Sequence, residues 1–471
     1  MTDDIGTETD GCDLGDQRLN ARYKLLLERL GDPPQLRIPA ACRGAAEVDA
    51  AYRVFDHPAI TPDLLLAPHQ AATRRRMAEQ PGGVVAQDTT AIDLTRRHRV
   101  VGGPLADDNR CGFFCHLSLA VTPTGVPVGV LASQTWSRDP ETVGQSKANR
   151  KYQSIDETES LRWIEGYRAC CDAARSLPGV DVMSVSDSEA DMSELFVEAT
   201  TPDHAATFLV RACQNRRLVG QDRQYVRESV AATPVLGTRM VRVSGRPAKP
   251  SETRARRTSR TERDAVLTIQ ATTVTRKSPW RVDGELPAVT VTVVLAREVN
   301  PPAGEEPIEW LLVTDVAAAT RAQAERVLDL YPLRWQVEVY FRVLKSGCGV
   351  ETLQLETAER FLNALTVYQI VAWRVLPLTM LGRACPELPC ETVLTEAEWK
   401  AVYRVVVGKK LPKTPPTLGA MVRWIAMLGG YLGRANDPPP GPKAMWVGLQ
   451  KARTLALAWE TFGPGAKSYA E

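Results

Sequence analysis

The stretch that decides the fold is Tyr331-Pro-Leu-Arg-Trp-Gln-Val-Glu-Val-Tyr-Phe-Arg-Val-Leu-Lys345, near the start of the chain's last third. A phenol, a carboxylate and two basic groups recur in it at intervals of three, four and seven residues: Tyr331, Arg334, Glu338 and Lys345. In a helix, at about 100° per residue, they fall within an arc of roughly 60°. The neighbouring arc is apolar, so the stretch predicts an amphipathic helix that buries one face and shows a carboxylate flanked by cations.

Two interpretations of this polar stripe compete. Glu and Lys on a helix surface are usually a solvated face. Here the carboxylate also suits a metal ion, and the flanking cations suit phosphate. Pro332 affects the geometry, because proline disfavours a helical residue before it and favours the first helical turn. We therefore expect the helix that holds Glu338 to start at Pro332, after a break from 321–330.

Length and composition bound the remaining possibilities. The 471 residues allow two to four domains, and the net charge is only +2. No apolar run approaches the ~20 residues of a membrane span, and the acidic start does not resemble a signal peptide. We expect a cytoplasmic protein without a membrane partner. Among ten cysteines and five histidines the nearest approach to a zinc cluster is Cys115 with His116, which packed strand residues explain better. Carboxylates therefore remain the candidate metal ligands.

Taken in order, the chain alternates between helical and mixed regions. Residues 1–80 are predicted to form a small helical domain. Residues 81–217 are predicted to form three strands followed by a helix, a strand, a helix and a strand. This order predicts a mixed sheet with crossovers. Residues 218–315 show strand signals alone. The mixed fold resumes over 316–384, and 385–471 is a helical tail. In the first domain Arg18, Arg22, Arg43 and Arg53 could contact a nucleic-acid backbone or could simply be scattered on the surface. The basic run that includes Arg254, Arg256 and Arg257 attracts polyanions, although a solvated loop would look the same.

Three acidic positions could meet at one edge of the mixed sheet. Asp88 lies in a strand, Asp187 ends a strand and Glu338 lies on the helix. Hard cations such as Mg²⁺ prefer oxygen ligands, and two such ions can support in-line displacement at phosphorus. Each acid also has an ordinary explanation: Asp88 could end a strand in a turn, and Asp187 could cap the next helix. Glu189 and Asp191 compete with Asp187, which we prefer because it comes first after the strand.

These motifs resemble the bacterial cut-and-paste DDE transposases of the insertion sequence four family, especially the transposon five-like members. The matches are Gln87-Asp88-Thr89-Thr90, Asp187-Ser-Glu-Ala-Asp191 and a Tyr-x2-Arg-x3-Glu-x6-Lys signature. Weaker similarity extends from Leu14-Gly-Asp to Met445-Trp, so it covers nearly the whole chain. The resemblance implies an α/β fold: an RNase H-like mixed-sheet core of the retroviral integrase type, with an all-β insertion at 218–315, an N-terminal helical DNA-binding domain and a C-terminal helical dimerisation domain.

The resemblance also implies the reaction and its residues. A homodimer would synapse two transposon ends, nick them, release the element through DNA hairpins and join the 3′ ends to target DNA. Asp88, Asp187 and Glu338 would hold two Mg²⁺ ions, for which Mn²⁺ can substitute. Tyr331, Arg334 and Lys345 would grip the terminal phosphates. Two further residues carry over from the resemblance. Trp310 would stack on a flipped base, although the sequence alone would make it a core residue. Arg211 would lie near the cleaved phosphate.

Two departures from the family pattern keep a second function open. The family usually has arginine where this chain has Ser188, and Pro332 is unusual inside the signature. Neither change removes a metal ligand. The alternative to an active transposase is therefore a domesticated or regulatory protein that binds transposon-like DNA without cutting it.

Overall fold

The computed structural model describes residues 5–31, 37–95, 101–105, 110–140, 154–201, 204–220, 224–245, 259–281, 284–434, 437 and 439–464. The chain divides into two compact units, each assembled from segments that lie far apart in the sequence. The first unit comprises Met1–Pro81, Asp88–Gly144 and Trp335–Glu471, and the second comprises Gly82–Gln87 and Gln145–Arg334. One boundary falls inside strand β1 (Gly82–Asp93), directly before Asp88. The domain boundaries expected from the sequence stay predictions.

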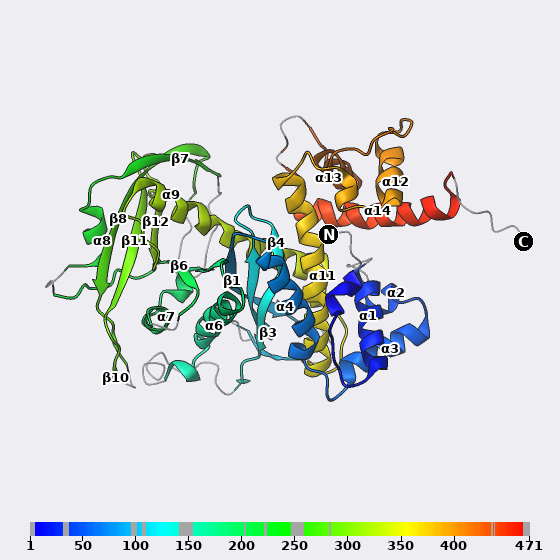
Figure 1. Cartoon of the computed structure of the whole chain (residues 1–471), viewed down its shortest axis with the longest axis horizontal. Coiled ribbons are helices and arrows are strands. Elements are labelled where there is room, and N and C mark those ends of the chain that lie inside the picture. Colours follow the sequence, from blue (N-terminus) through cyan, green and yellow to red (C-terminus); the bar gives the residue numbers. More distant parts are fainter. Residues whose placement is uncertain are drawn as a thin grey trace, which may run out of the picture. The chain divides into compact units, whose positions relative to one another are not determined.

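The second unit is built on a mixed sheet with the strand order β1-β5-β6-β12-β11-β8-β7 (Figure 1). The first three strands are parallel, and the remaining neighbours pair antiparallel. Beyond β1 their bounds are β5 Asp181–Ser186, β6 Thr207–Arg211, β12 Glu309–Thr314, β11 Val289–Glu298, β8 Arg263–Arg276 and β7 Gly237–Val243. This arrangement is a mixed α/β fold consistent with an RNase H-like transposase core.

Helices pack on both faces of this sheet. Helix α9 (Arg321–Leu330) buries Val327 and Leu328 in the cluster that contains Leu209 of β6. The adjacent residue Phe208 points to the opposite face, because side chains alternate along a strand. There its ring lies 5.2 Å from the ring of Phe196 on helix α7 (Ser193–Ala199). Helix α6 (Leu161–Ser176) packs against β5. The two layers bury the parallel strands, as crossover topology requires.

Segment 218–315 is rich in strands, as the sequence predicts, but it also contains a helix. The expected strands near residues 240, 266–274, 288–296 and 310–314 are confirmed, and a short β9 (Trp280–Arg281) to β10 (Gly284–Glu285) pair is added. Helix α8 (Val226–Ala231) interrupts the pattern, so the expectation of strands alone is not confirmed. Val226 and Val230, four residues apart, are both buried, which is helical spacing.

The first unit surrounds an antiparallel hairpin of β3 (Cys111–Val121) and β4 (Pro127–Trp136). The turn predicted between them is confirmed, and Gly125 there adopts a φ of 88°. Helix α4 (Pro62–Ala78) and the apolar helix α11 (Ala358–Ala384) pack on β4. A short strand β2 (Gly103–Pro104) pairs with β3. The end of β1, from Asp88 to Asp93, also belongs to this unit.

Further helices complete the first unit at both ends of the chain. At the N-terminal end these are η1 (Ile5–Thr9), α1 (Gln17–Gly31), α2 (Ile38–Ala41) and α3 (Ala45–Asp56). The Tyr23 hydroxyl of α1 donates a hydrogen bond to the Leu65 carbonyl of α4 at 2.6 Å. At the C-terminal end are α12 (Glu396–Val406), α13 (Leu418–Leu428) and α14 (Pro442–Phe462). In the described part of the chain no helix combines the length and apolar character needed to cross a membrane.

Candidate active site

Asp187 is placed by the end of strand β5 in the second unit. The strand residues from Val182 to Ser186 are buried, and Asp187 is the first residue to emerge, half-buried. Its Oδ1 accepts a hydrogen bond from the Glu189 amide at 2.8 Å and so caps the 3₁₀ turn η4 (Ser188–Ala190). The capping role anticipated as the ordinary explanation is therefore real. It leaves other lone pairs of the carboxylate available to a ligand.

The two acids that compete with Asp187 are both held by arginines. Glu189 lies 2.6 Å from Nη2 of Arg162. Asp191 is only 4% exposed, and its Oδ1 lies 2.8 Å from Nη2 of Arg276. Two main-chain amides donate to its other oxygen. Burial by itself would raise the pKa of Asp191, but Arg276 and these hydrogen bonds outweigh it and lower the pKa. Asp191 is thus a structural anion, and Asp187 remains the better candidate ligand.

Four expected DNA-binding residues gather near Asp187 within the second unit. Tyr331 is 4% exposed, and its ring lies 5.9 Å from the ring of Trp310 on β12. Burial raises the pKa of the Tyr331 hydroxyl, the guanidinium groups of Arg334 and Arg211 counteract the rise, and the negative charge of Asp187 adds to it. The phenol therefore stays protonated at neutral pH and can donate a hydrogen bond. A carboxylate, a phenol and two guanidinium groups together form a setting suited to a phosphodiester.

The backbone around Tyr331 differs from the sequence expectation. Helix α9 ends at Leu330 as expected, but the helix that holds Glu338 begins at Trp335 and not at Pro332. Tyr331 keeps helical angles of φ −59° and ψ −42°, and its amide still donates to the Val327 carbonyl. The chain tightens instead into a 3₁₀ turn, η5 (Tyr331–Arg334), before α10 (Trp335–Arg342). Proline has no amide hydrogen to place, and the change of hydrogen-bonding pattern accommodates it. In a 3₁₀ turn residues i and i+3 eclipse, which aligns Tyr331 with Arg334.

Glu338 lies on α10 in the first unit. The helix buries Val337, Tyr340 and Phe341, and the Tyr340 hydroxyl donates to the Gln369 carbonyl of α11 at 2.8 Å. The predicted apolar face is therefore confirmed, and Glu338 itself is half-buried. Packing of α10 against β3 and α11 fixes the direction in which Glu338 points.

Asp88 begins the part of β1 that belongs to the first unit. It is half-buried, and its Oδ1 accepts a hydrogen bond from the Thr89 amide at 2.7 Å. The Thr89 hydroxyl lies 2.9 Å from Nδ1 of His116, which is buried on β3. His116 therefore supports the strand beside Asp88, and a zinc site with Cys115 is not needed to explain it.

Lys345 is tied to the same strand. It lies in a π-helical turn, Val343–Gly347, where its Nζ donates to the Ala91 carbonyl at 2.7 Å. Nζ also lies 3.2 Å from Glu351, which accepts a hydrogen bond from the Asp93 amide at 3.0 Å. The sequence indicated neither Glu351 nor the π turn. Turns of this kind occur often at functional sites.

The strand register locates each aspartate along its own strand. In the second unit β1 pairs with β5 in parallel, and the last pair is Ala86 with Val185. Gln87 continues the pairing through a 2.7 Å hydrogen bond from its side chain to the Ser184 hydroxyl. Asp88 and Asp187 each follow two residues after that last pair. Asp187 thus follows the end of β5 directly, whereas Asp88 lies inside β1, which continues to Asp93.

The ligand atoms of the three candidate acids determine which divalent metal ion they could hold. Among the described residues no three His, Cys, Asp or Glu side chains stand as a ready metal cluster. Asp187 belongs to the second unit, whereas Asp88 and Glu338 belong to the first. The three offer only carboxylate oxygens, the donor type that Mg²⁺ prefers over softer metals. The donor chemistry therefore fits Mg²⁺.

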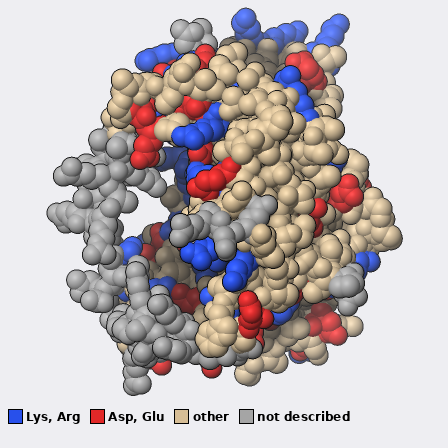
Figure 2. Space-filling view, turned by 90° about the vertical axis from the view of Figure 1, so that its left-hand side faces the viewer, with Lys and Arg blue, Asp and Glu red and all other residues tan. Residues whose placement is uncertain are grey.

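The other basic residues predicted to contact DNA lie in the first unit or outside the described residues. Arg18 and Arg53 are exposed on α1 and α3, and Arg22 is half-buried on α1. Figure 2 shows Lys and Arg side chains interspersed with Asp and Glu on the face that it presents. Arg254, Arg256 and Arg257 lie outside the described residues. Their proposed contacts with DNA stay predictions.

Comparisons with known proteins identify three domains. Residues 4–60 match a model described as transposase DNA-binding, residues 187–373 match the transposase DDE domain, and residues 370–471 match the transposase Tn5 dimerisation domain. A solved structure of the piggyBac transposase synaptic complex with hairpin DNA is also similar, at 9% identity and a TM-score of 0.29. That similarity covers 72% of this chain and 55% of the other, so this chain spans about half the length of that solved relative. The chain is therefore similar, region by region, to the DNA-binding, DDE and dimerisation domains of transposases.

Proposed function

We propose that the protein is a DDE transposase of Tn5-like kind, which binds the terminal inverted repeats of a transposon, cleaves the ends and joins their 3′ ends to target DNA. The observation that carries the proposal is the setting of Asp187. It emerges from β5 beside a protonated phenol and two guanidinium groups, those of Tyr331, Arg211 and Arg334. A phosphodiester needs hydrogen-bond donors and positive charge, and hydrolysis of it needs an anionic ligand for a metal.

Asp88, Asp187 and Glu338 are the proposed ligands of two Mg²⁺ ions, for which Mn²⁺ can substitute. Bound ions would supply Lewis-acid stabilisation of the phosphoryl oxygens and would activate the attacking oxygen. Support comes from the oxygen-only donor set of the three acids and from the position of Asp187 directly after the end of β5. The arginine pairing of Glu189 and Asp191 also favours Asp187 as the second ligand.

The remaining signature residues would handle the DNA. Arg211 and Arg334 would neutralise phosphate oxygens, and Tyr331 would donate a hydrogen bond to one of them. Trp310 would stack on a base displaced during formation of a DNA hairpin, a step that offsets part of the cost of unstacking. Lys345 would reach a further phosphate only after exchanging its contact with Glu351, because that carboxylate is now its closest anionic partner.

The three matched domains suggest how the DNA is held. We propose that residues 1–80 bind the terminal repeat, with Arg18, Arg22 and Arg53 on its backbone, and that Arg254, Arg256 and Arg257 contact DNA elsewhere. Residues 385–471 would dimerise two copies in a synaptic complex. Residues 218–315 would then be an insertion in an RNase H-like core formed by 81–217 and 316–384. The enzyme would work at the nucleoid in the bacterial cytoplasm.

The test uses DNA that carries the inverted repeats flanking the gene, with Mg²⁺ and the full chain. We expect nicked ends and hairpins from the unmodified protein, and loss of both with retained binding in Glu338→Gln. Glu325→Gln is the matched control, because that carboxylate on α9 pairs with Arg321 one turn away. Binding without scission by the unmodified protein would refute catalysis. It would favour a regulatory end-binding protein, the alternative raised by Ser188 at a position where the family usually has arginine.

A further inference from the structure

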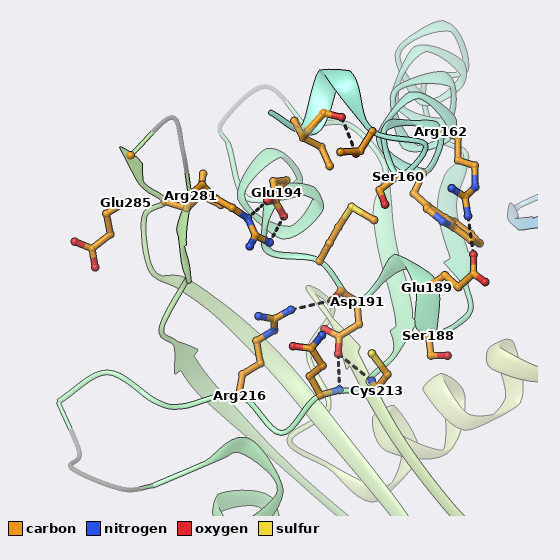
Figure 3. A pocket seen from close by; sticks show the side chains of 17 residues that line it. Ser160, Arg162, Ser188, Glu189, Asp191, Glu194, Cys213, Arg216, Arg281 and Glu285 are labelled. Atoms are coloured by element: carbon orange, nitrogen blue, oxygen red, sulfur yellow. Dashed lines mark hydrogen bonds and ion pairs between the residues drawn. The ribbon is translucent and has the colours of Figure 1, made fainter. Parts of the chain in front are cut away.

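A cavity of about 720 Å³ opens in the second unit where β5 and β6 end (Figure 3). Ser188 and Met192 line it after β5, and Cys213 and Arg216 line it after β6. The β9–β10 hairpin closes another side through Arg281. The volume lies within the range of roughly 300–1,000 Å³ typical of small-ligand sites. The carboxyl ends of parallel strands are also where open α/β sheets bind ligands.

Most charges that face the cavity cancel one another. Arg162 pairs with Glu189 on one wall, and Arg281 pairs with Glu194 on the opposite wall. Asp191, at the floor, is neutralised by Arg276. The walls are therefore polar without a strong excess of positive charge. Such a surface suits a neutral ligand with hydrogen-bond donors and acceptors better than it suits a free phosphate ion.

Arg216 is the exception among these side chains. Its Nη2 donates to the main-chain carbonyl of Asp191 at 3.2 Å, and no carboxylate among the described residues forms an ion pair with its guanidinium. Burial, reinforced by the nearby Arg276 and Arg281, lowers the pKa of Arg216 even though Asp191 counteracts it. A guanidinium that lines a cavity without a carboxylate partner is a favourable place for a hydrogen-bond acceptor to bind.

The rest of the lining suits a flat, partly apolar ring. Ile155, Met192 and Leu286 contribute apolar surface, and Ser160 and Gln214 contribute polar groups. A nucleobase combines an apolar face with a polar edge. Among the bases guanine presents two adjacent acceptors, O6 and N7, which arginine recognises with paired donors.

We propose that this cavity receives a single unstacked nucleotide of the DNA, guanine by preference, with Arg216 as its recognition residue. The proposal rests on the proposed function. It adds a base-specific pocket directly after Asp187, through Ser188 and Glu189, and distinct in its residues from the Trp310–Tyr331 pair. The site would hold one displaced base next to the cleaved position and would give the enzyme a sequence preference at that position.

Cys213 offers a direct probe of occupancy, because it is exposed and lines the cavity. Alkylation of its thiol by iodoacetamide can be followed by peptide mass spectrometry, with the exposed Cys385 of the first unit as the internal reference. At twice its dissociation constant, deoxyguanosine monophosphate should slow the alkylation of Cys213 about threefold by mass action and leave Cys385 unchanged. Inorganic phosphate at the same concentration should protect neither.

Variants separate the pocket from catalysis and from folding. Protection should disappear in Arg216→Ala, weaken in Arg216→Lys and persist in Arg217→Ala, since Arg217 is exposed and lies over the Tyr225 ring instead. It should also persist in Glu338→Gln, so that loss of cleavage and loss of the pocket are separate results. Equal protection by phosphate would replace the proposal with a simple anion site. Absence of protection by the mononucleotide and by transposon-end DNA would overturn it.

Discussion

The assignment of Asp187 over Asp191 makes opposite predictions for two conservative changes. In Asp187→Asn the new side chain can still accept the Glu189 amide hydrogen bond, since Asn and Asp cap helices about equally well. We expect the free energy of unfolding to change by less than about 0.5 kcal/mol, as for an ordinary surface substitution. Cleavage should fall by about 10³-fold or more, because a lost metal ligand removes several kcal/mol of transition-state stabilisation.

Asp191→Asn should behave in the opposite way. It leaves Arg276, which is 4% exposed, without its anionic partner. Breaking a buried ion pair by removing one partner costs about 3–5 kcal/mol. One oxygen of Asn can still accept from the Cys213 and Gln214 amides, so the loss should lie near the lower end of that range. Nicking per folded molecule should fall far less than in Asp187→Asn.

Unfolding by urea is followed by circular dichroism. End nicking is measured separately in Mg²⁺ without urea, under conditions where each variant is folded. Arg276→Met is a matched partner, since it removes the cation and keeps the length of the side chain. The assignment of Asp191 as the structural anion is refuted if Asp187→Asn unfolds as readily as Asp191→Asn. It also fails if Asp191→Asn abolishes nicking while its unfolding midpoint stays at the original value.

Three further predictions test other parts of the molecule. Trp310→Ala should slow hairpin formation by about 5- to 150-fold, the equivalent of ~1–3 kcal/mol of stacking, and should spare first-strand nicking; equal loss at both steps in gel assays would make Trp310 structural. Removal of 254–260 should reduce the salt slope of DNA binding by about 0.9 per lost phosphate contact, whereas an unchanged slope would mean that this run does not touch DNA. His69 is buried and its Nε2 accepts the Val130 amide, so burial lowers its pKa below 6.5, and the unfolded chain takes up a proton that the folded chain does not. The free energy of unfolding should therefore fall by up to about 1.4 kcal/mol per pH unit below pH 6.5. Urea titrations should show that His69→Gln removes this slope. Glu8 has a pKa of about 2 in the folded chain, so its protonation lowers the free energy of unfolding only below pH 4.5.

Local patterns in the sequence were sufficient for much of the fold. The run of β-branched and small residues before Asp88 and before Asp187 predicts buried strands, and both are present. The apolar arc next to Glu338 predicts the face that α10 buries. These features depend on periods of two or 3.6 residues, which are visible in any short window.

Other features depend on pairs of residues far apart in the chain. The bond between Asp191 and Arg276 joins positions 85 residues apart, and the bond between Glu351 and the Asp93 amide joins positions 258 apart. No local period reveals such partners. For that reason the sequence left Asp187, Glu189 and Asp191 as competitors, and only the contacts of the folded chain separate an acid with a structural partner from one that can serve a ligand.

The signature between Tyr331 and Lys345 does not lie on the single uniform helix that its spacing predicts. The chain passes through a 3₁₀ turn, an α-helix and a π turn within 17 residues of Tyr331. The 3₁₀ turn uses three residues per turn, so Arg334 eclipses Tyr331 and its guanidinium reaches the phenol. Pro332, which was expected to begin the helix of Glu338, lies in this turn and is compatible with it because proline needs no amide donor. The π turn widens the helix at the other end, where Lys345 contacts the Ala91 carbonyl three residues after Asp88. The spacing of the four residues is therefore best understood as three kinds of turn in sequence, each of which sets the direction of a different functional side chain.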